Sequence, residues 1–222
     1  MGIPVLILGD SGSGKSTSLR NFDPAEIGVF NVASKRLPFR KALAVQNYGI
    51  VDGPDNRKYK RRLGYEDIQE ALGRGKFKSY AIDDSQYLLA FDFFERATET
   101  GYNKFTDMAV SFRNLIQYVI ANTPPDVIVY FLHHTEQTQD GKLKAKTIGK
   151  MLDEKLTVEG LFSIVLLAQA KKDSYVFVTQ SQGYSTAKSP MDMFPPEIDN
   201  DLKMVDDTIR EYWGLTQEGD SE

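Results

Sequence analysis

The sequence contains no cysteine, and this absence removes several kinds of chemistry at once. Disulfide bridges, thiolate metal sites and cysteine nucleophiles are all excluded. Histidine is almost as scarce, with only His133 and His134 among 222 residues, so we do not expect a histidine-based metal centre. A chain without cysteine suits a reducing compartment, and we expect a cytoplasmic protein.

Long apolar runs are also missing from the sequence. None approaches the roughly 18 to 20 residues that a membrane-spanning helix needs. The first residues, "MGIPVLILGD", lack the basic region and the small-residue cleavage site of a secretory signal peptide. We therefore expect a soluble protein with no membrane partner.

Acidic residues are slightly fewer than basic ones until the chain nears its end. The net charge is −4, yet residues 1–191 carry 25 basic and 21 acidic side chains, whereas residues 192–222 carry two and ten. Length favours one main domain, which we place at residues 1–190, with residues 191–222 as an acidic extension that contains a helix. Such a tail either masks a basic surface or is simply solvated.

Hydrophobic periodicity predicts an α/β fold. Apolar strand-like segments alternate with helical patterns through the first two-thirds of the chain and then follow one another directly. This order favours a mainly parallel sheet flanked by helices, with antiparallel strands added late. We expect strands at 3–8, 25–33, 79–84, 126–134, 161–169 and 174–180, and helices at 15–22, 65–72, 85–99, 105–122, 150–156 and 201–213. Residues 34–64 show only weak periodicity.

The stretch "GDSGSGKST" at residues 9–17 matches the phosphate-binding motif G-x-x-x-x-G-K-[ST]. Its glycines let successive backbone N–H groups face one anion, at the positive end of the helix that follows. Lys15 is expected to contact the β- and γ-phosphates and to act in catalysis, and Ser16 to bind Mg²⁺. The predicted nucleotide-binding residues are Gly9, Asp10, Ser11, Gly12, Ser13, Gly14, Lys15, Ser16 and Thr17.

Two carboxylates end the apolar stretch "SYAIDD". Asp83 is placed to hold Mg²⁺, and Asp84 to orient or deprotonate an attacking water. The alternative is that this pair only caps the next helix at Ser85.

Guanine-specific signals are absent. Asp83 is followed three residues later by Gln86 and not by glycine, and no N-K-x-D motif occurs, so we favour an adenine nucleotide. A polar group after the strand at 126–132 can sense the γ-phosphate in ATPases that have an additional strand. We name His133 as the catalytic candidate there, with His134 and Thr135 as alternatives.

Six segments, in this order, resemble the RecA-like AAA-family P-loop ATPases of phages, a group of nucleotide-binding proteins that includes single-strand annealing ATPases. The segments are "LILGDSGSGKST", "NVASKRLPFR", "YAIDDSQYL", "VYFLHHTEQ", "KTIGKML" and "TAKSP". The resemblance covers most of residues 1–190 and implies a RecA-like P-loop core, bound ATP and Mg²⁺, and host cytoplasm as the location. One departure is that "NVASKR" lacks the glutamate that recombinases carry after the second strand, so hydrolysis is expected to be slow or to depend on Asp84.

Two basic stretches are candidates for contacts with single-stranded DNA, because cations follow phosphates and aromatic rings stack on bases. The alternative for each stretch is a solvated loop. Lys142, Lys144, Lys146 and Lys188 could instead reach the γ-phosphate of a neighbouring subunit. The DNA candidates are Arg57, Lys58, Lys60, Arg61, Arg62, Lys142, Lys144 and Lys146.

The sequence thus predicts an oligomeric, Mg²⁺-dependent ATPase that acts on single-stranded DNA in recombination, annealing or replication, alongside phage or host proteins of those processes. One alternative is a small-molecule or nucleotide kinase, whose basic residues 57–62 would close over phosphates. The other is a non-hydrolysing ATP switch that loads a partner protein such as a helicase.

Overall fold

A computed structural model describes residues 1–54, 57–148 and 157–215 of the chain. The helix expected at 150–156 lies outside these residues.

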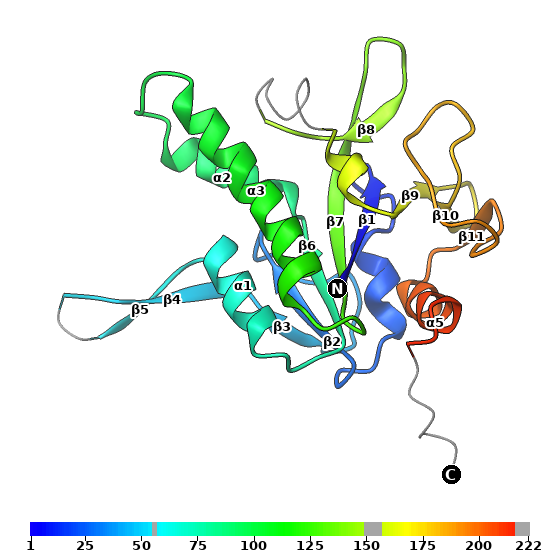
Figure 1. The fold of residues 1–222 in the computed structure, drawn as a ribbon, viewed down its shortest axis with the longest axis horizontal. Helices are drawn as coiled ribbons and strands as arrows, with labels where there is room; N and C mark the ends of the chain where they lie inside the picture. The colour runs from blue at the N-terminus through cyan, green and yellow to red at the C-terminus, as the bar shows by residue number, and fades with distance from the viewer. Residues whose placement is uncertain (55–56, 149–156, 216–222) are drawn as a thin grey trace.

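A central sheet organises the molecule (Figure 1). Its strands run in the order β11-β10-β9-β1-β7-β6-β2-β3, and every pairing from β9 to β3 is parallel, whereas β10 and β11 are antiparallel. The mainly parallel sheet with late antiparallel strands is therefore confirmed. The strands are β1 (Ile3–Gly9), β2 (Ile27–Asn31), β3 (Ala44–Gln46), β6 (Ser79–Asp83), β7 (Ile128–Gln137), β9 (Ile164–Ala170), β10 (Tyr175–Val178) and β11 (Glu197–Asp199).

Helices cover both faces of this sheet. Strand β1 shows why, since Leu6 and Leu8 pack into one apolar cluster while Val5 and Ile7 pack into another on the opposite face. A strand that is apolar on both faces needs such two-sided cover. One cluster includes side chains from α1 (Tyr65–Gly73), α2 (Gln86–Glu95) and α3 (Asn103–Asn122), and the other includes side chains from η1 (Ser16–Asn21) and α5 (Leu202–Tyr212).

The helix expected at 15–22 is a short 3₁₀ helix, η1. Pro24 follows three residues after η1 and limits its extension. The Ser18 hydroxyl also donates to the carbonyl of Lys15 at 2.5 Å, a local bond that competes with regular helix geometry. Short segments of this kind are typical of 3₁₀ helices.

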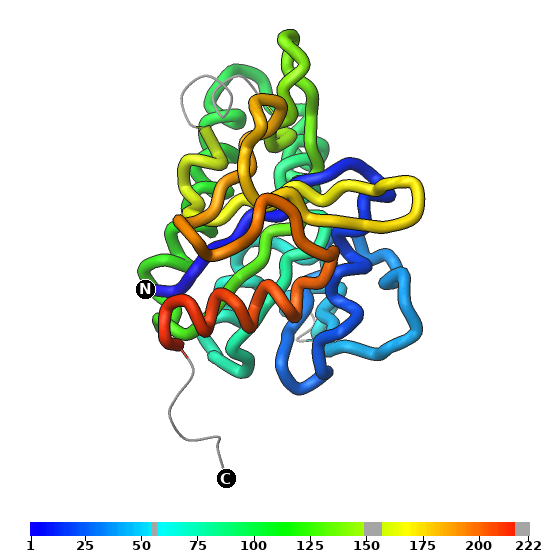
Figure 2. The backbone as a smooth tube through the Cα atoms, turned by 90° about the vertical axis from the view of Figure 1, so that its right-hand side faces the viewer, coloured from blue at the N-terminus to red at the C-terminus, as the bar shows by residue number. Residues whose placement is uncertain are grey.

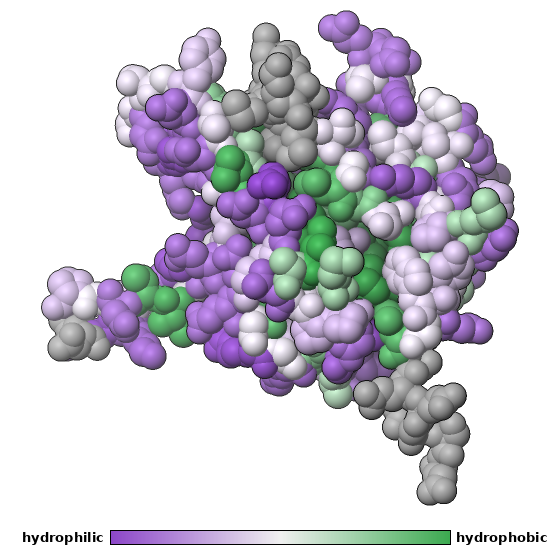
Figure 3. Space-filling view, viewed as in Figure 1, coloured by the Kyte–Doolittle hydropathy of each residue, from purple (hydrophilic) through white to green (hydrophobic). Residues whose placement is uncertain are grey.

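Residues 34–64 contain a hairpin that the periodicity did not predict. Strands β4 (Tyr48–Asp52) and β5 (Lys58–Arg62) pair antiparallel and project from the body as a ribbon (Figure 1). Ile50 and Tyr59 are exposed on it, and Figure 3 shows apolar surface along the ribbon. Because neither face is fully buried, no apolar alternation marks these strands. A second hairpin joins β7 to β8 (Leu143–Ala145), and η2 (Val158–Leu161) precedes β9.

The C-terminal elements belong to the same sheet and core. Strand β11 pairs with β10, and α5 packs beside η1 (Figure 2). Arg20 donates to the carbonyl of Asn200 at 2.6 Å, and Asn21 donates to the carboxylate of Asp201 at 2.7 Å. Side-chain and backbone contacts therefore hold the start of α5 against η1.

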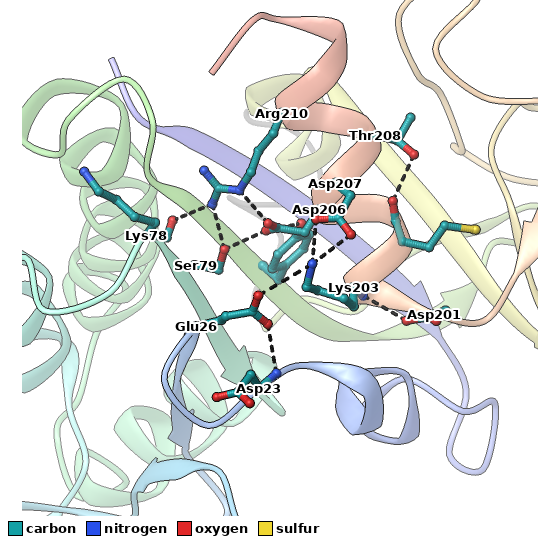
Figure 4. A network of polar contacts seen from close by, with 12 residues as sticks. Asp23, Glu26, Lys78, Ser79, Asp201, Lys203, Asp206, Asp207, Thr208 and Arg210 are labelled. Carbon is teal, nitrogen blue, oxygen red and sulfur yellow. Dashed lines mark hydrogen bonds and ion pairs between the residues drawn. The ribbon is translucent and has the colours of Figure 1, made fainter. Parts of the chain in front are cut away.

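A buried polar network fixes α5 on the sheet (Figure 4). The carboxylate of Asp206 accepts from the hydroxyls of Ser79 and Tyr130, at 2.7 and 2.9 Å, and pairs with Arg210 at 2.6 Å. Arg210 also donates to the carbonyl of Asp126 at 2.9 Å. Burial, and next the charge of Asp206, raise the pKa of Tyr130 well above its ordinary value, so Tyr130 stays a neutral donor.

Arg210→Met should lower the free energy of unfolding by about 3 kcal/mol, because it leaves the buried Asp206 carboxylate without its cation. Lys203→Met is the matched control, since Lys203 and Asp207 form another i,i+4 pair on α5, at 2.6 Å, but Asp207 is 59% exposed. Loss of such an exposed pair costs less than about 1 kcal/mol. Urea unfolding followed by circular dichroism measures both, and equal losses in the two variants would contradict the prediction.

Candidate functional site

The loop after β1 has backbone geometry that requires glycine. Gly12 and Gly14 have φ values of 81° and 93°, which side chains with a Cβ rarely adopt. At Gly9 a Cβ would lie 2.4 Å from the Ser13 hydroxyl and 2.9 Å from the carbonyl of Ala168. The glycine spacing of the motif therefore meets the steric demands of this loop.

Lys15 is buried within the loop that follows β1. Its exposed fraction is 6%, and its ammonium donates to the carbonyls of Gly9 and Asp10 at 2.7 and 2.9 Å. Burial lowers the pKa of Lys15 to about 8, although the carboxylates of Asp84, Asp83 and Asp10 oppose that shift. An anion at the loop must therefore draw the ammonium away from two carbonyl groups.

Ser16 and Asp83 meet at the end of β6. The Ser16 hydroxyl donates to the Asp83 carboxylate at 2.7 Å. Burial raises the pKa of Asp83, while the hydrogen bond from Ser16 lowers it. Within residues 1–54, 57–148 and 157–215, no three carboxylate or histidine side chains cluster as a metal site. Ser16 and Asp83 do fit Mg²⁺, which prefers one or two protein oxygens together with phosphate oxygens.

Asp84 has two cationic or polar partners and a strained backbone. Its φ is 60°, which is uncommon for a residue with a side chain. One carboxylate oxygen pairs with the Lys35 ammonium at 2.7 Å, and the other lies 3.2 Å from Nε2 of His134. Burial favours a higher pKa, but hydrogen bonds from His134 and Lys35 outweigh it and lower the pKa of Asp84 to about 2. These contacts, and not capping of α2, engage the side chain.

Of the three sensor candidates, the structure brings His134 to the cavity and turns His133 away from it. His133 is fully buried, with Nδ1 2.9 Å from the Ser85 hydroxyl and Nε2 2.7 Å from the carbonyl of Lys146. That carbonyl can only accept, so Nε2 carries the proton and Nδ1 accepts from Ser85. The hydroxyl of Thr135 donates to the Asp10 carboxylate. The choice of His133 as the catalytic candidate is therefore wrong, because His133 lies in the protein interior and does not line the cavity.

A cavity of about 320 Å³ joins these groups. Lys35, Arg36 and Pro38 line it together with Asp84, and Tyr175 lines it together with the glycine loop. Sequence analysis did not select these four residues. The signal for Lys35 was its place just after a strand parallel to β1, because the carboxyl ends of parallel strands meet at one edge. The lining residues are Ser11, Gly12, Gly14, Lys15, Ser16, Thr17, Lys35, Arg36, Pro38, Asp83, Asp84, His134 and Tyr175.

Asn200 and Tyr175 pack against the glycine loop from the side of β10. A Cβ on Gly14 would lie 2.9 Å from the Tyr175 ring and 3.1 Å from the Asn200 amide oxygen. Among the described residues, both amide atoms of Asn200 are buried without a hydrogen-bond partner. No sequence pattern links residues so far apart, so only the fold identifies this contact.

The side chains of the basic stretch at residues 57–62 have different surroundings. Arg61 pairs with Asp67 of α1 at 2.8 Å, and Arg62 pairs with Glu95 of α2 at 2.5 Å. These two arginines thus join the ribbon to the helices. Lys58 and Lys60 lie on the ribbon itself, and the Lys60 ammonium lies 4.0 Å from the centre of the Tyr48 ring. Arg57 precedes β5.

The second basic stretch lies on a different side of the molecule (Figure 1). Lys144 belongs to β8 and pairs with Glu136 at 2.9 Å. The described lining of the cavity includes none of Lys142, Lys144, Lys146 and Lys188, so within one subunit these lysines do not reach the site.

Comparisons with known proteins give no assignment. No protein-family model matches the sequence, and a search of curated proteins finds no match. In the part of the chain that the structure describes, no helix has both the length and the apolar character needed to cross a membrane.

The buried His133 should make stability depend on pH. Burial lowers the pKa of His133 to about 4 from an ordinary value of 6.5. At pH values between these two, His133 is protonated in the unfolded chain and neutral in the native state. This contribution to stability is present above pH 6.5 and is lost as the pH falls towards 4, and the loss reaches about 2 kcal/mol by pH 5.

Urea unfolding at pH 8 and pH 5 tests this dependence. His133→Gln should reduce the loss of unfolding free energy between the two pH values by about 2 kcal/mol, whereas His134→Gln should retain the contribution of His133. A pH dependence that is the same in His133→Gln as in the parent would contradict the prediction.

Proposed function

We propose that this protein is a Mg²⁺-dependent P-loop ATPase with a RecA-like core. The observation that carries the proposal is the convergence of Lys15, the Ser16–Asp83 pair and Asp84 on one cavity. Strand β7 also lies between β1 and β6, and this order supports the additional-strand type of P-loop ATPase. The groups meet at the carboxyl ends of parallel strands, where ligands of open α/β sheets bind.

Charged side chains line the cavity around Asp84, and Tyr175 also lines it, beside Gly14. The charged groups and the glycine loop suit phosphates, and a base can stack on the half-exposed Tyr175 ring. Because no guanine motif accompanies the loop, we keep adenine as the base.

Each residue of the site has a distinct part in this proposal. Lys15 leaves the carbonyls of Gly9 and Asp10 for the phosphates, and Ser16 and Asp83 would hold Mg²⁺. The ion supplies charge neutralisation on the phosphate oxygens. Asp84 orients the attacking water, and His134, which contacts Asp84, takes the sensor role that the sequence suggested for His133. The hydrogen bond from His134, ahead of that from Lys35, lowers the pKa of Asp84 to about 2. Such a carboxylate is a weak base, so slow hydrolysis is expected.

The projecting hairpin supports single-stranded DNA as the partner. Tyr48 and Tyr59 are exposed on it, at 40% and 46%, beside Lys58 and Lys60. Aromatic rings that stack on bases and lysines that follow phosphates are the two elements of sequence-independent binding to single strands. We place this activity in phage recombination, annealing or replication, in an oligomer in which lysines of the β7–β8 hairpin can act on a neighbour.

Two other functions use the same cavity. A small-molecule or nucleotide kinase would consume ATP only with an acceptor. A switch that loads a partner such as a helicase would bind ATP and hardly hydrolyse it, an outcome that the absence of a carboxylate in "NVASKR" favours.

ATP turnover by the purified protein, measured with and without single-stranded DNA, separates these functions. We expect slow turnover that DNA stimulates, and a loss of roughly 10²-fold in Asp84→Asn. A requirement for a small acceptor would establish the kinase, and tight ATP binding without turnover would establish the switch.

The DNA contact is tested with the double variant Lys58→Ala, Lys60→Ala. Its affinity for single strands should fall, and the slope of affinity against salt should flatten by roughly 1.4, at about 0.7 per phosphate contact. Lys171→Ala, Lys172→Ala is the matched control on the turn between β9 and β10 and should keep the parent slope. Absence of single-strand binding by the parent, with or without nucleotide, would rule out the DNA partner.

A further inference from the structure

Lys35 lines the cavity together with Asp83 and Asp84. It is a cation that does not belong to the glycine loop. Its ammonium lies 2.7 Å from a carboxylate oxygen of Asp84 and 5.2 Å from the centre of the Tyr87 ring. The side chain is nevertheless 59% exposed, whereas that of Asp84 is 10% exposed. Asp84 thus binds the Lys35 ammonium, although more than half of the Lys35 side chain is exposed.

The backbone of Lys35 is fixed by the end of β2. The Asn31 amide donates to the carbonyl of Lys35 at 2.5 Å and to the Asn47 side chain at 2.7 Å, and it accepts from the Lys35 N–H at 3.2 Å. Asn31 is itself paired in register with Asp83. Ser34 has a φ of 53°, a costly conformation for a residue with a Cβ. The fold therefore places Lys35 in the same cavity as Ser16 and Asp83, the residues proposed to hold Mg²⁺.

A terminal phosphate would be a better partner for this ammonium than Asp84 is. Asp84 has a second donor in His134, at 3.2 Å, and does not depend on Lys35 alone. A γ-phosphate brings close to two negative charges and several acceptor oxygens, and hydrogen bonds between charged groups are the strong ones. The flexible four-carbon stem of a lysine allows its ammonium to change partner while its backbone stays in place.

On the basis of the proposed function, we infer that Lys35 is a γ-phosphate ligand: its ammonium exchanges Asp84 for the terminal phosphate when ATP binds. ADP lacks that phosphate and leaves the Lys35–Asp84 pair intact. The site thereby distinguishes ATP from ADP through a cation of the same subunit. In some other phosphoryl-transfer proteins, a neighbouring molecule supplies the corresponding cation.

Calorimetric titration with Mg²⁺ and either a non-hydrolysable ATP analogue or ADP tests this inference. Lys35→Gln should weaken binding of the analogue by about ten- to a hundredfold, the usual effect of losing a hydrogen bond to a charged group, and should leave the affinity for ADP within about twofold. Lys41→Gln changes an exposed lysine of the same segment that is outside the cavity lining, and should bind both nucleotides as the parent does. Lys35→Arg should retain the preference for the analogue.

The Asp84→Asn background separates a direct contact from a change in repulsion. Lys35→Gln alone also leaves the Asp84 charge unneutralised, which would repel any γ-phosphate. In Asp84→Asn that charge is gone, and Lys35→Gln should still weaken the analogue by about tenfold, so the double-mutant cycle isolates the contact with phosphate.

Three outcomes would overturn this inference alone. Equal changes for the analogue and ADP, no change for either, or an analogue affinity in Asp84→Asn that is indifferent to Lys35→Gln would each show that Lys35 does not contact the terminal phosphate. These results leave the proposed function standing. Failure of the parent to bind either nucleotide would overturn the proposed function and this inference with it.

Discussion

The parallel pairing of β1 with β7 decides where every polar group of the site is placed. The register runs from Ile3 opposite Ile128 to Gly9 opposite His134, and β6 and β2 continue it on the far side of β7. All four strands therefore end at one edge of the sheet. The glycine loop follows β1, Asp84 follows β6, and the segment that contains Lys35 follows β2. Apolar packing on both faces of the sheet fixes this edge, so the core determines the geometry of the cavity.

The charged groups of the site are paired with other groups of the protein. Lys15 donates to two loop carbonyls, Lys35 and His134 engage Asp84, and Ser16 donates to Asp83. In the proposed function, a nucleotide would have to replace these bonds, so part of its binding free energy would offset the loss of the existing partners. The inferred exchange at Lys35 would make the site sensitive to the number of phosphates.

Local signals in the sequence were sufficient for the glycine loop and for the pair Asp83–Asp84, but not for Lys35, although Lys35 also follows a strand. The loop matches a glycine-rich motif, and the pair consists of carboxylates at the end of an apolar strand. The choice between His133 and His134 was not predicted, because successive residues of a strand face opposite sides and the sequence did not show which side faces the site. In the structure His133 shares a face of β7 with Val129 and Phe131 and lies against Phe112 of α3. The exposed hairpin carries no periodic signal. Tyr175 lies in a predicted strand, but only tertiary contacts place it at the site.

The central claim is that the loop after β1 binds the phosphates of ATP through Lys15. Calorimetric titration of Mg²⁺–ATP into the parent and into Lys15→Ala tests this claim most directly. The account predicts one nucleotide bound per subunit of the parent, with affinity at least about tenfold weaker in Lys15→Ala, since a charged hydrogen bond to phosphate is lost. Equal affinity in the two proteins, or no binding by the parent, would contradict it.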